Sequence, residues 1–165
     1  MSMASGGKFS IRMDTSQVLA SIDALEEDCR AAARPAAQAG AQVLYNAVKA
    51  NVAGIRRVSG NLASSIYQAY SKDNSNQAIA QYHVSWNAKK APHGHLVEWG
   101  HLMRYEVTFD PATGRFTTHK DRPLTTPRQV AARPFVRPAA AKFPEANEAM
   151  RKRYLEELVK RGVLS

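Results

Sequence analysis

The 165-residue chain contains a single cysteine, Cys29. A lone cysteine excludes an intramolecular disulfide and a zinc site built from several thiolates. The first residues, MSMASGGK, lack the apolar core of a secretory signal peptide. No apolar run approaches the roughly 20 residues that a membrane span needs. We therefore expect a soluble protein that is synthesised in the cytoplasm and has no membrane contact.

The sequence also lacks the common catalytic motifs. It has no G-x-S-x-G nucleophile motif and neither of the glycine-rich phosphate loops, G-x-x-x-x-G-K-[ST] and G-x-G-x-x-G. Cys29 lies beside acidic residues, an unfavourable setting for a thiolate nucleophile. Most carboxylates fall in the two terminal helical segments, where solvated helix faces explain them. We expect no enzyme activity, no catalytic residues and no cofactor.

One segment, HGHLVEWGH, groups side chains that can bind metal: His93, His95, Glu98 and His101. Two histidines with one residue between them can converge on an ion from a strand, but not from one face of a helix. The segment has no H-E-x-x-H pattern and no accompanying H-x-E…P-C-x-x-C pattern. A polar turn whose histidines form hydrogen bonds or lie at an interface is the alternative, and we predict no metal site.

The net charge of +9 is unevenly distributed. Residues 1–50 hold five basic and five acidic residues, whereas residues 51–137 hold twelve basic and five acidic ones. A surface formed by the middle of the chain should therefore face something negative, such as nucleic acid or an acidic protein. The alternative is that the protein is basic and soluble with no specific partner for this charge.

The basic residues from 115 to 128 have one interleaved aromatic residue, Phe116. Cationic loops suit sequence-independent contact with phosphates, but a single-strand binder normally offers several aromatic rings for stacking. Contact with DNA passing nearby and contact with an acidic protein partner both remain open. The candidate residues for either contact are Arg115, Lys120, Arg122 and Arg128.

Hydrophobic periodicity indicates a helical first part. Phe9, Ile11 and Met13 alternate with polar residues and predict a short strand. Helix caps follow at 14–16, and apolar residues at helical spacing predict one long helix to residue 52, kinked at Pro35. Its alanine-rich middle lets another backbone, that of a sheet or of a neighbouring subunit, approach closely, although helix propensity also explains the alanines. A short second helix is predicted over residues 59–66, with Ser59 or Asn61 as its cap and with Leu62 and Ile66 on one face.

The second part of the chain reads as strands and a final helix. Residues 66–72 and 78–88 predict two antiparallel strands, and residues 91–101 a short helical turn. Residues 105–109 and 115–119 flank turn chemistry and predict a hairpin, after which residues 119–132 predict a long extended loop. The last amphipathic helix should bury Ala140, Phe143, Met150, Tyr154 and Leu158, with Pro144 kinking or beginning it.

These elements predict an α+β fold in one domain. A small antiparallel sheet should be packed by the long N-terminal helix and the C-terminal helix, with a protruding β-hairpin and long loop. We predict a flexible leader at 1–8 and a single domain at 9–165, carrying the hairpin and extended loop as an insertion at 102–132.

Three stretches in order carry a family resemblance: SGNLASSI (59–66), HLVEWG (95–100) and ARPFVRPA (132–139). They resemble the G-x-L-x-x-S-I, aromatic-x-x-V-E-x-G and R-P-F-x-R-P-A stretches of the tailed-phage family named after the HK97 gp10 tail component. The resemblance covers roughly residues 15–160. The chain departs from it at His101, where the family commonly has Thr, and in the longer connection from 101 to 131.

The resemblance implies a structural virion protein at the head-to-tail neck, acting as a tail-completion or tail-terminator protein. Its implied partners are further copies of itself in a ring, sixfold by analogy. They also include the connector or stopper, the tail terminator, the tail tube, and packaged DNA in the lumen. A stand-alone, non-specific nucleic-acid-binding module using residues 115–137 is the alternative function.

The third stretch has a physical interpretation of its own. Proline fixes its own φ and pushes the preceding residue to extended geometry, so two Arg-Pro steps should hold the chain around Phe135 nearly rigid. Pro138 also suits the first turn of a helix. Rigid helix entry in a monomer explains this equally well. We predict an interface with other subunits or partners at His95, Glu98, Trp99, Arg133, Phe135 and Arg137.

Overall fold

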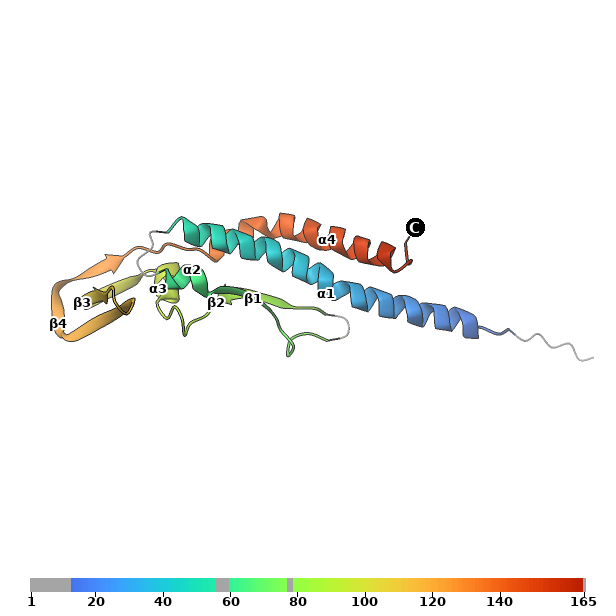
Figure 1. The fold of residues 1–165 in the computed structure, drawn as a ribbon, viewed down its shortest axis with the longest axis horizontal. Helices are drawn as coiled ribbons and strands as arrows, with labels where there is room; N and C mark the ends of the chain where they lie inside the picture. The colour runs from blue at the N-terminus through green and yellow to red at the C-terminus, as the bar shows by residue number, and fades with distance from the viewer. Residues whose placement is uncertain (1–12, 56–59, 77–78, 165) are drawn as a thin grey trace, which may run out of the picture.

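The structure, a computed structural model, describes residues 13–55, 60–76 and 79–164. Figure 1 shows an elongated molecule in which two helices, α1 (Ser16–Ala53) and α4 (Phe143–Lys160), lie side by side. The smaller elements lie along the other side of α1. A β-hairpin occupies one end of the long axis, and the beginning of α1 projects at the other. The predicted α+β class is confirmed.

Helix α1 confirms the predicted long helix and runs through Pro35. It begins after Asp14, whose carboxylate accepts hydrogen bonds from the backbone N–H and the hydroxyl of Ser16. Its alanine-rich middle packs against α4. A methyl group at Gly40 would lie 2.5 Å from Cγ of Met150, so this small residue permits the close approach of the two helices. The close neighbour at Gly40 is therefore α4, and not the predicted sheet or neighbouring subunit.

The first sheet pairs β1 (Ile66–Tyr70) with β2 (Tyr82–Trp86) in the predicted antiparallel sense, with Ile66 opposite Trp86. It follows α2 (Asn61–Ser65), which begins after Gly60 at φ 75°. The prediction that Ile66 belongs to this helix was wrong, because Ile66 starts β1. Its side chain still packs in the same core as Leu62, since a helix and a following strand can bury adjacent residues on one side.

The second sheet is a long two-stranded hairpin. After α3 (Gly94–Trp99), which confirms the predicted helical turn, β3 (His101–Asp110) pairs with β4 (Arg115–Val130). Residues 119–130 therefore form a strand, and the predicted long loop was wrong. Pro123 is accommodated opposite Tyr105, where the register shifts, because a two-stranded sheet consists of edge strands that tolerate proline.

A 3₁₀ helix, η1 (Arg137–Lys142), leads directly into α4. Pro138 lies in its first turn as predicted, and Pro144 lies in the first turn of α4, so Pro144 begins that helix. On α4, Leu158 is buried against α1 as predicted. Phe143 contradicts the predicted buried stripe, because it is 54% exposed at the junction where the 3₁₀ helix changes to an α-helix.

The core lies where α1, α2, β1, β2 and the residues before η1 converge. Phe135 is its largest completely buried side chain, and its ring meets that of Trp86 edge-on, 5.5 Å between centroids. The other buried members are Val48, Val52, Leu62, Ile66, Ala91 and Ala139. Segments far apart in the sequence are thus joined around one aromatic ring.

Some predictions fall outside the described residues. These are the leader at 1–8, the strand through Phe9 and Ile11, and a cap at Ser59. Among the helices that the structure describes, none combines the length and apolarity needed to cross a membrane.

Phe135→Ala tests the anchoring role of this ring. Because Phe135 is completely buried, we expect its truncation to lower the free energy of unfolding by about 3–5 kcal/mol, measured by urea denaturation. Phe143→Ala is a matched control with the same atoms removed from an exposed position, and should change stability by about 0.5 kcal/mol or less. Equal effects of the two variants would contradict the anchoring role of Phe135.

Candidate assembly interface

The segment between β4 and η1, residues 131–136, is called the strap here. Glu98, on α3, holds it by hydrogen bonds to three successive backbone N–H groups. Its Oε2 accepts from Phe135 at 2.7 Å and from Val136 at 3.0 Å, and its Oε1 accepts from Arg137 at 3.0 Å. The Glu98 side chain is only 3% exposed. A buried carboxylate thus binds the backbone at the entry to η1.

Arg137 completes this arrangement from the strap side. Its Nε donates to Oε1 of Glu98 at 3.1 Å, and its Nη2 donates to the Glu98 backbone carbonyl at 2.6 Å. Its guanidinium carbon lies 4.1 Å from the centroid of the Trp99 ring. The flat guanidinium group suits both contacts, which a lysine could not reproduce. Trp99 itself is 64% exposed, so this stacked pair faces outward.

The prolines of the strap remove hydrogen-bond donors that would otherwise need partners. Arg133 donates its N–H to the carbonyl of Val97 at 2.8 Å, and Ala139 donates to Val136 at 3.0 Å. Between them, Glu98 accepts hydrogen bonds from the N–H groups of Phe135, Val136 and Arg137. Pro134 and Pro138 have no N–H to satisfy. Every backbone donor from 133 to 139 is therefore paired, including that of the buried Phe135.

The strap is also tied to α1 and to the root of the hairpin. Asn51 donates from Nδ2 to the carbonyl of Phe135 at 2.9 Å. Gly100 adopts φ 72°, and a methyl group there would lie 2.7 Å from the carbonyl oxygen of Val130. Only glycine combines that backbone conformation with that close approach. The two strands of the hairpin therefore leave the body at a closely packed point.

The electrostatics of Glu98 follow from these contacts. Burial acts to raise the pKa of Glu98, but the hydrogen bonds from Val136, Phe135 and Arg137 lower it more, and the net pKa lies below its ordinary value. The carboxylate is therefore charged at neutral pH, and this charge holds the strap. Its oxygens are occupied by protein donors.

The histidines of the same segment are dispersed. His95 is exposed, whereas His93 packs edge-on against Phe116, 5.8 Å between ring centroids. Burial lowers the pKa of His93 from its ordinary value, and the nearby charge of His95 adds to this. In the described part of the chain, no three His, Cys, Asp or Glu side chains form a group suited to a metal ion. Glu98, as shown above, binds the strap.

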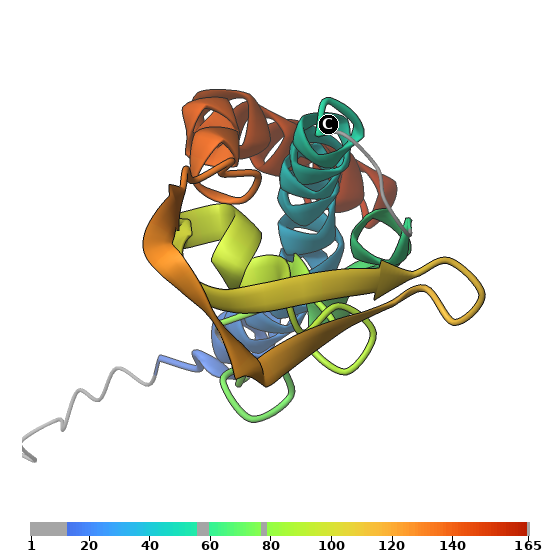
Figure 2. The same cartoon turned by 90° about the vertical axis from the view of Figure 1, so that its left-hand side faces the viewer.

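The hairpin presents a different kind of surface. No residue from His101 to Val130 is buried. Figure 2 shows its strands crossing the end of the molecule, with the turn projecting beyond the helices. Apolar side chains remain open on it, with Tyr105 38%, Val107 39% and Phe116 45% exposed. A two-stranded ribbon with so little cover is marginal in water. Apart from the contact of Phe116 with His93, the hairpin therefore has little packing against the described part of the chain.

The four predicted basic contacts all lie on β4 and are exposed. Arg122 is 3.5 Å from Glu106 on the opposite strand and 3.9 Å from Asp121. Among the residues that the structure describes, Arg115, Lys120 and Arg128 form no ion pair. These three cations are available to a partner.

The six predicted interface residues divide into two groups. Glu98 and Phe135 are buried within the subunit, so their side chains hold the strap and offer no surface to a partner. His95, Trp99, Arg133 and Arg137 are exposed around them. Sequence reasoning identified the two stretches, but it did not identify the bond between them.

Sequence reasoning also missed a second unpartnered surface, at the beginning of α1. Every residue from Ser16 to Glu27 is exposed, including Leu19 and Ile22. The available signal was charge. Residues 14–29 hold five acidic residues and neither lysine nor arginine, in a chain that is otherwise strongly basic.

Glu98→Gln tests the carboxylate at the strap. The variant removes the charge and places an amide NH₂ against backbone donors, so we expect a loss of about 1.5–3 kcal/mol in the free energy of unfolding at pH 7. Because the folded pKa of Glu98 is lowered, its stabilisation is complete above the unfolded pKa, about 4.3, and is lost as the pH falls through the folded pKa.

The stability difference between wild type and Glu98→Gln should therefore shrink below about pH 4.3, measured by urea denaturation from pH 7 to pH 3. Glu145→Gln, which alters an exposed carboxylate on α4, is the control and should differ little from wild type at any pH. A constant difference between wild type and Glu98→Gln would contradict a charged Glu98 at the strap.

Comparison with known protein families places this chain in one of them. A family model described as "Bacteriophage HK97-gp10, putative tail-component" matches residues 16–100, just over half of the chain. The match ends at Gly100, and the strap lies beyond it, joined to the matched part through Glu98. No curated protein and no solved structure matches the chain. The chain belongs to the HK97-gp10-like family of phage tail components.

Proposed function

We propose that this phage tail component is a structural, non-enzymatic virion protein that forms a closed ring, sixfold by family analogy, at the head–tail junction. There it acts as a tail-completion or tail-terminator protein and joins the tail to the head. It is synthesised in the cytoplasm of the host bacterium. Its partners are its own copies, the tail tube or terminator on one side and the connector or stopper on the other.

The observation that carries this proposal is the uncovered hairpin. Thirty consecutive residues, from His101 to Val130, contribute no buried side chain to their own subunit. A segment of this length gains its stability from contacts elsewhere, and further copies of the chain or neighbouring virion proteins can supply them. Glu98 fixes the strap at the root of the hairpin, so the hairpin leaves the body at the same angle in every subunit. Its contacts with a neighbour are therefore reproducible.

In this proposal the mechanism is assembly. The helices and the β1–β2 sheet form the wall of the ring, and the hairpin reaches a neighbouring subunit, an adjoining ring or the lumen. Exposed His95, Trp99, Arg133 and Arg137 surround its root and extend the contact surface. The resulting ring caps the tail tube and offers the head-side connector a docking surface.

A second candidate function is non-specific nucleic-acid binding. It is favoured by the exposed cations Arg115, Lys120 and Arg128 on the hairpin. In a ring the same cations would face DNA passing through the lumen. The two functions differ in salt dependence, because binding based on phosphate contacts weakens steeply as the salt concentration rises.

Removal of the hairpin tests the proposed function. Leu102 and Gln129 are directly opposed in the ladder, so a Gly-Gly link between them can replace residues 103–128. We expect this variant to keep its helical circular-dichroism signal and its core, but to remain monomeric by native mass spectrometry. Wild type, alone or with the tail-tube protein of the same phage, should form a closed oligomer of defined mass.

A full-length control carries Arg104→Gln in the hairpin, which removes one exposed charge and keeps the strands. It should assemble as wild type does. Wild type that stays monomeric with and without tail-tube protein, yet is retained on DNA at physiological salt, would replace the ring with the nucleic-acid-binding function.

A further inference from the structure

The beginning of α1 extends beyond the rest of the molecule. Helix α4 covers α1 only as far as Asp28, where Arg161 at the end of α4 approaches the carboxylate at 3.3 Å. The twelve residues from Ser16 to Glu27 lie outside this cover and are all exposed. At 1.5 Å per residue they project about 18 Å. Figure 1 shows this projection at one end of the molecule.

The projecting segment has an apolar face. Val18, Ile22 and Leu25 recur at helical spacing and are 59%, 54% and 47% exposed. The same stripe continues along α1 to Ala32 and Ala36, which are buried. The helix therefore presents one continuous packing face, of which the first three turns are exposed.

Charge limits what can cover this face. Residues 14–29 hold five acidic residues and no basic one, whereas all 23 lysines and arginines lie elsewhere in the chain. A second copy of the same segment is a poor partner, because like charges would be brought together. A basic surface with apolar side chains of its own is complementary.

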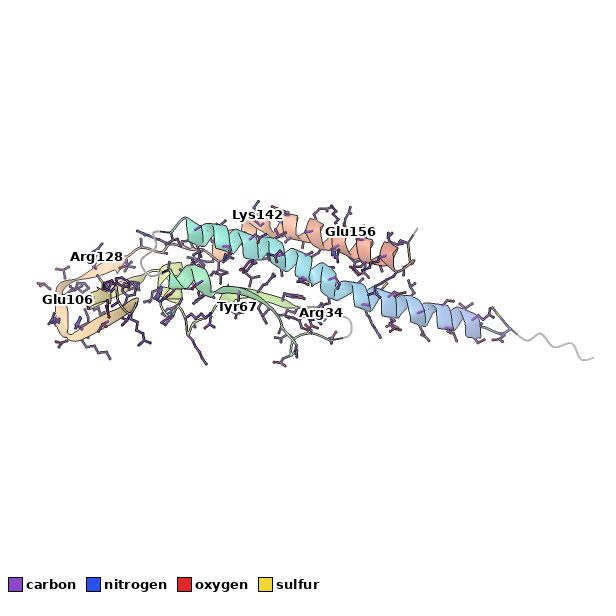
Figure 3. The ribbon with its side chains drawn as sticks, in the orientation of Figure 1. Arg34, Tyr67, Glu106, Arg128, Lys142 and Glu156 are labelled. Atoms are coloured by element: carbon purple, nitrogen blue, oxygen red, sulfur yellow. The ribbon has the colours of Figure 1, made fainter. Side chains whose placement is uncertain are left out.

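The hairpin and strap have this chemistry. Residues 101–136 hold six basic and three acidic residues, and Tyr105, Val107 and Phe116 are partly exposed among them. Lys120 and Arg128 form no ion pair in the described part of the chain. Figure 3 places Arg128 and Glu106 at the hairpin end, far along the molecule from the acidic beginning of α1. The two surfaces cannot meet within one subunit.

We propose that the acidic, apolar beginning of α1 in one subunit docks on the basic β3–β4 hairpin of the next subunit. This inference rests on the proposed self-assembly and assigns its contact. The two surfaces are different and lie at opposite ends, so the contact is head-to-tail. A contact of this kind generates a ring when its rotation closes.

Charge reversal tests the assignment in the full-length chain. Variant A carries Asp23→Lys and Glu27→Lys on α1, and variant B carries Lys120→Glu and Arg128→Glu on the hairpin. These residues are exposed, so both variants should keep wild-type circular-dichroism spectra. Each alone should weaken assembly by at least about tenfold in protein concentration, measured by sedimentation velocity and native mass spectrometry.

The decisive measurement is a mixture of the two variants. The reversed helix of A complements the reversed hairpin of B, and the native helix of B complements the native hairpin of A. An equimolar mixture should therefore recover assembly, with A and B in equal numbers in each oligomer. A single chain carrying all four substitutions should recover assembly by itself.

A control with Glu145→Lys and Glu148→Lys makes the same charge change on α4 and should assemble as wild type does. Ile22→Ser with Leu25→Ser removes the apolar contact and should abolish assembly without unfolding the chain. If this apolar variant fails to assemble while A and B assemble normally, the helix docks on an uncharged surface and the hairpin assignment is wrong. Wild type that never oligomerises would overturn the proposed ring itself.

Discussion

The architecture depends on one buried carboxylate. Glu98 accepts hydrogen bonds from three backbone N–H groups at the entry to η1, and the side chain of Arg137 donates a further one to the same carboxylate. Without this charge, the backbone donors of Phe135, Val136 and Arg137 would be left unsatisfied in a partly buried place, a cost comparable to a large part of the stability of a small domain. The contact joins α3 to the start of the C-terminal helix across more than thirty residues. The long hairpin therefore begins and ends at one fixed point of the body.

The fixed root of the hairpin separates the residues that stabilise the fold from those that can bind another molecule. Phe135 and the surrounding core determine where the strap lies, while the hairpin contributes no buried side chain and is free to match another molecule. The beginning of α1 is equally uncovered. The core is thus stable at its centre, while apolar side chains are exposed at both ends of the molecule. Exposed apolar surfaces of this kind favour association with a partner that covers them.

Local patterns predicted much of this fold. The spacing of apolar residues along α1 and the turn chemistry at 110–114 identified the long helix and the hairpin. The strand at 119–130 was missed because its sequence is polar and contains two prolines. In this two-stranded ribbon, the strand is determined by its pairing with β3 alone. Because neither face is buried, the sequence shows no alternation of apolar and polar residues. The sequence pattern also could not reveal the hydrogen bonds of Glu98, since most of its partners are backbone N–H groups, which every residue except proline has.

The division of charge along the molecule bears on the symmetry of any assembly. If both ends were basic and apolar, two subunits could pair end to end about a twofold axis and block further growth. With an acidic end and a basic end, like ends repel, and a chain of subunits is favoured over an isolated pair. Whether such a chain closes, and after how many subunits, then depends on the angle between α1 and the hairpin. Glu98 and Phe135 are buried and hold the root of the hairpin. In the proposed ring, substitutions at these two residues should therefore change the closure without altering either contact surface.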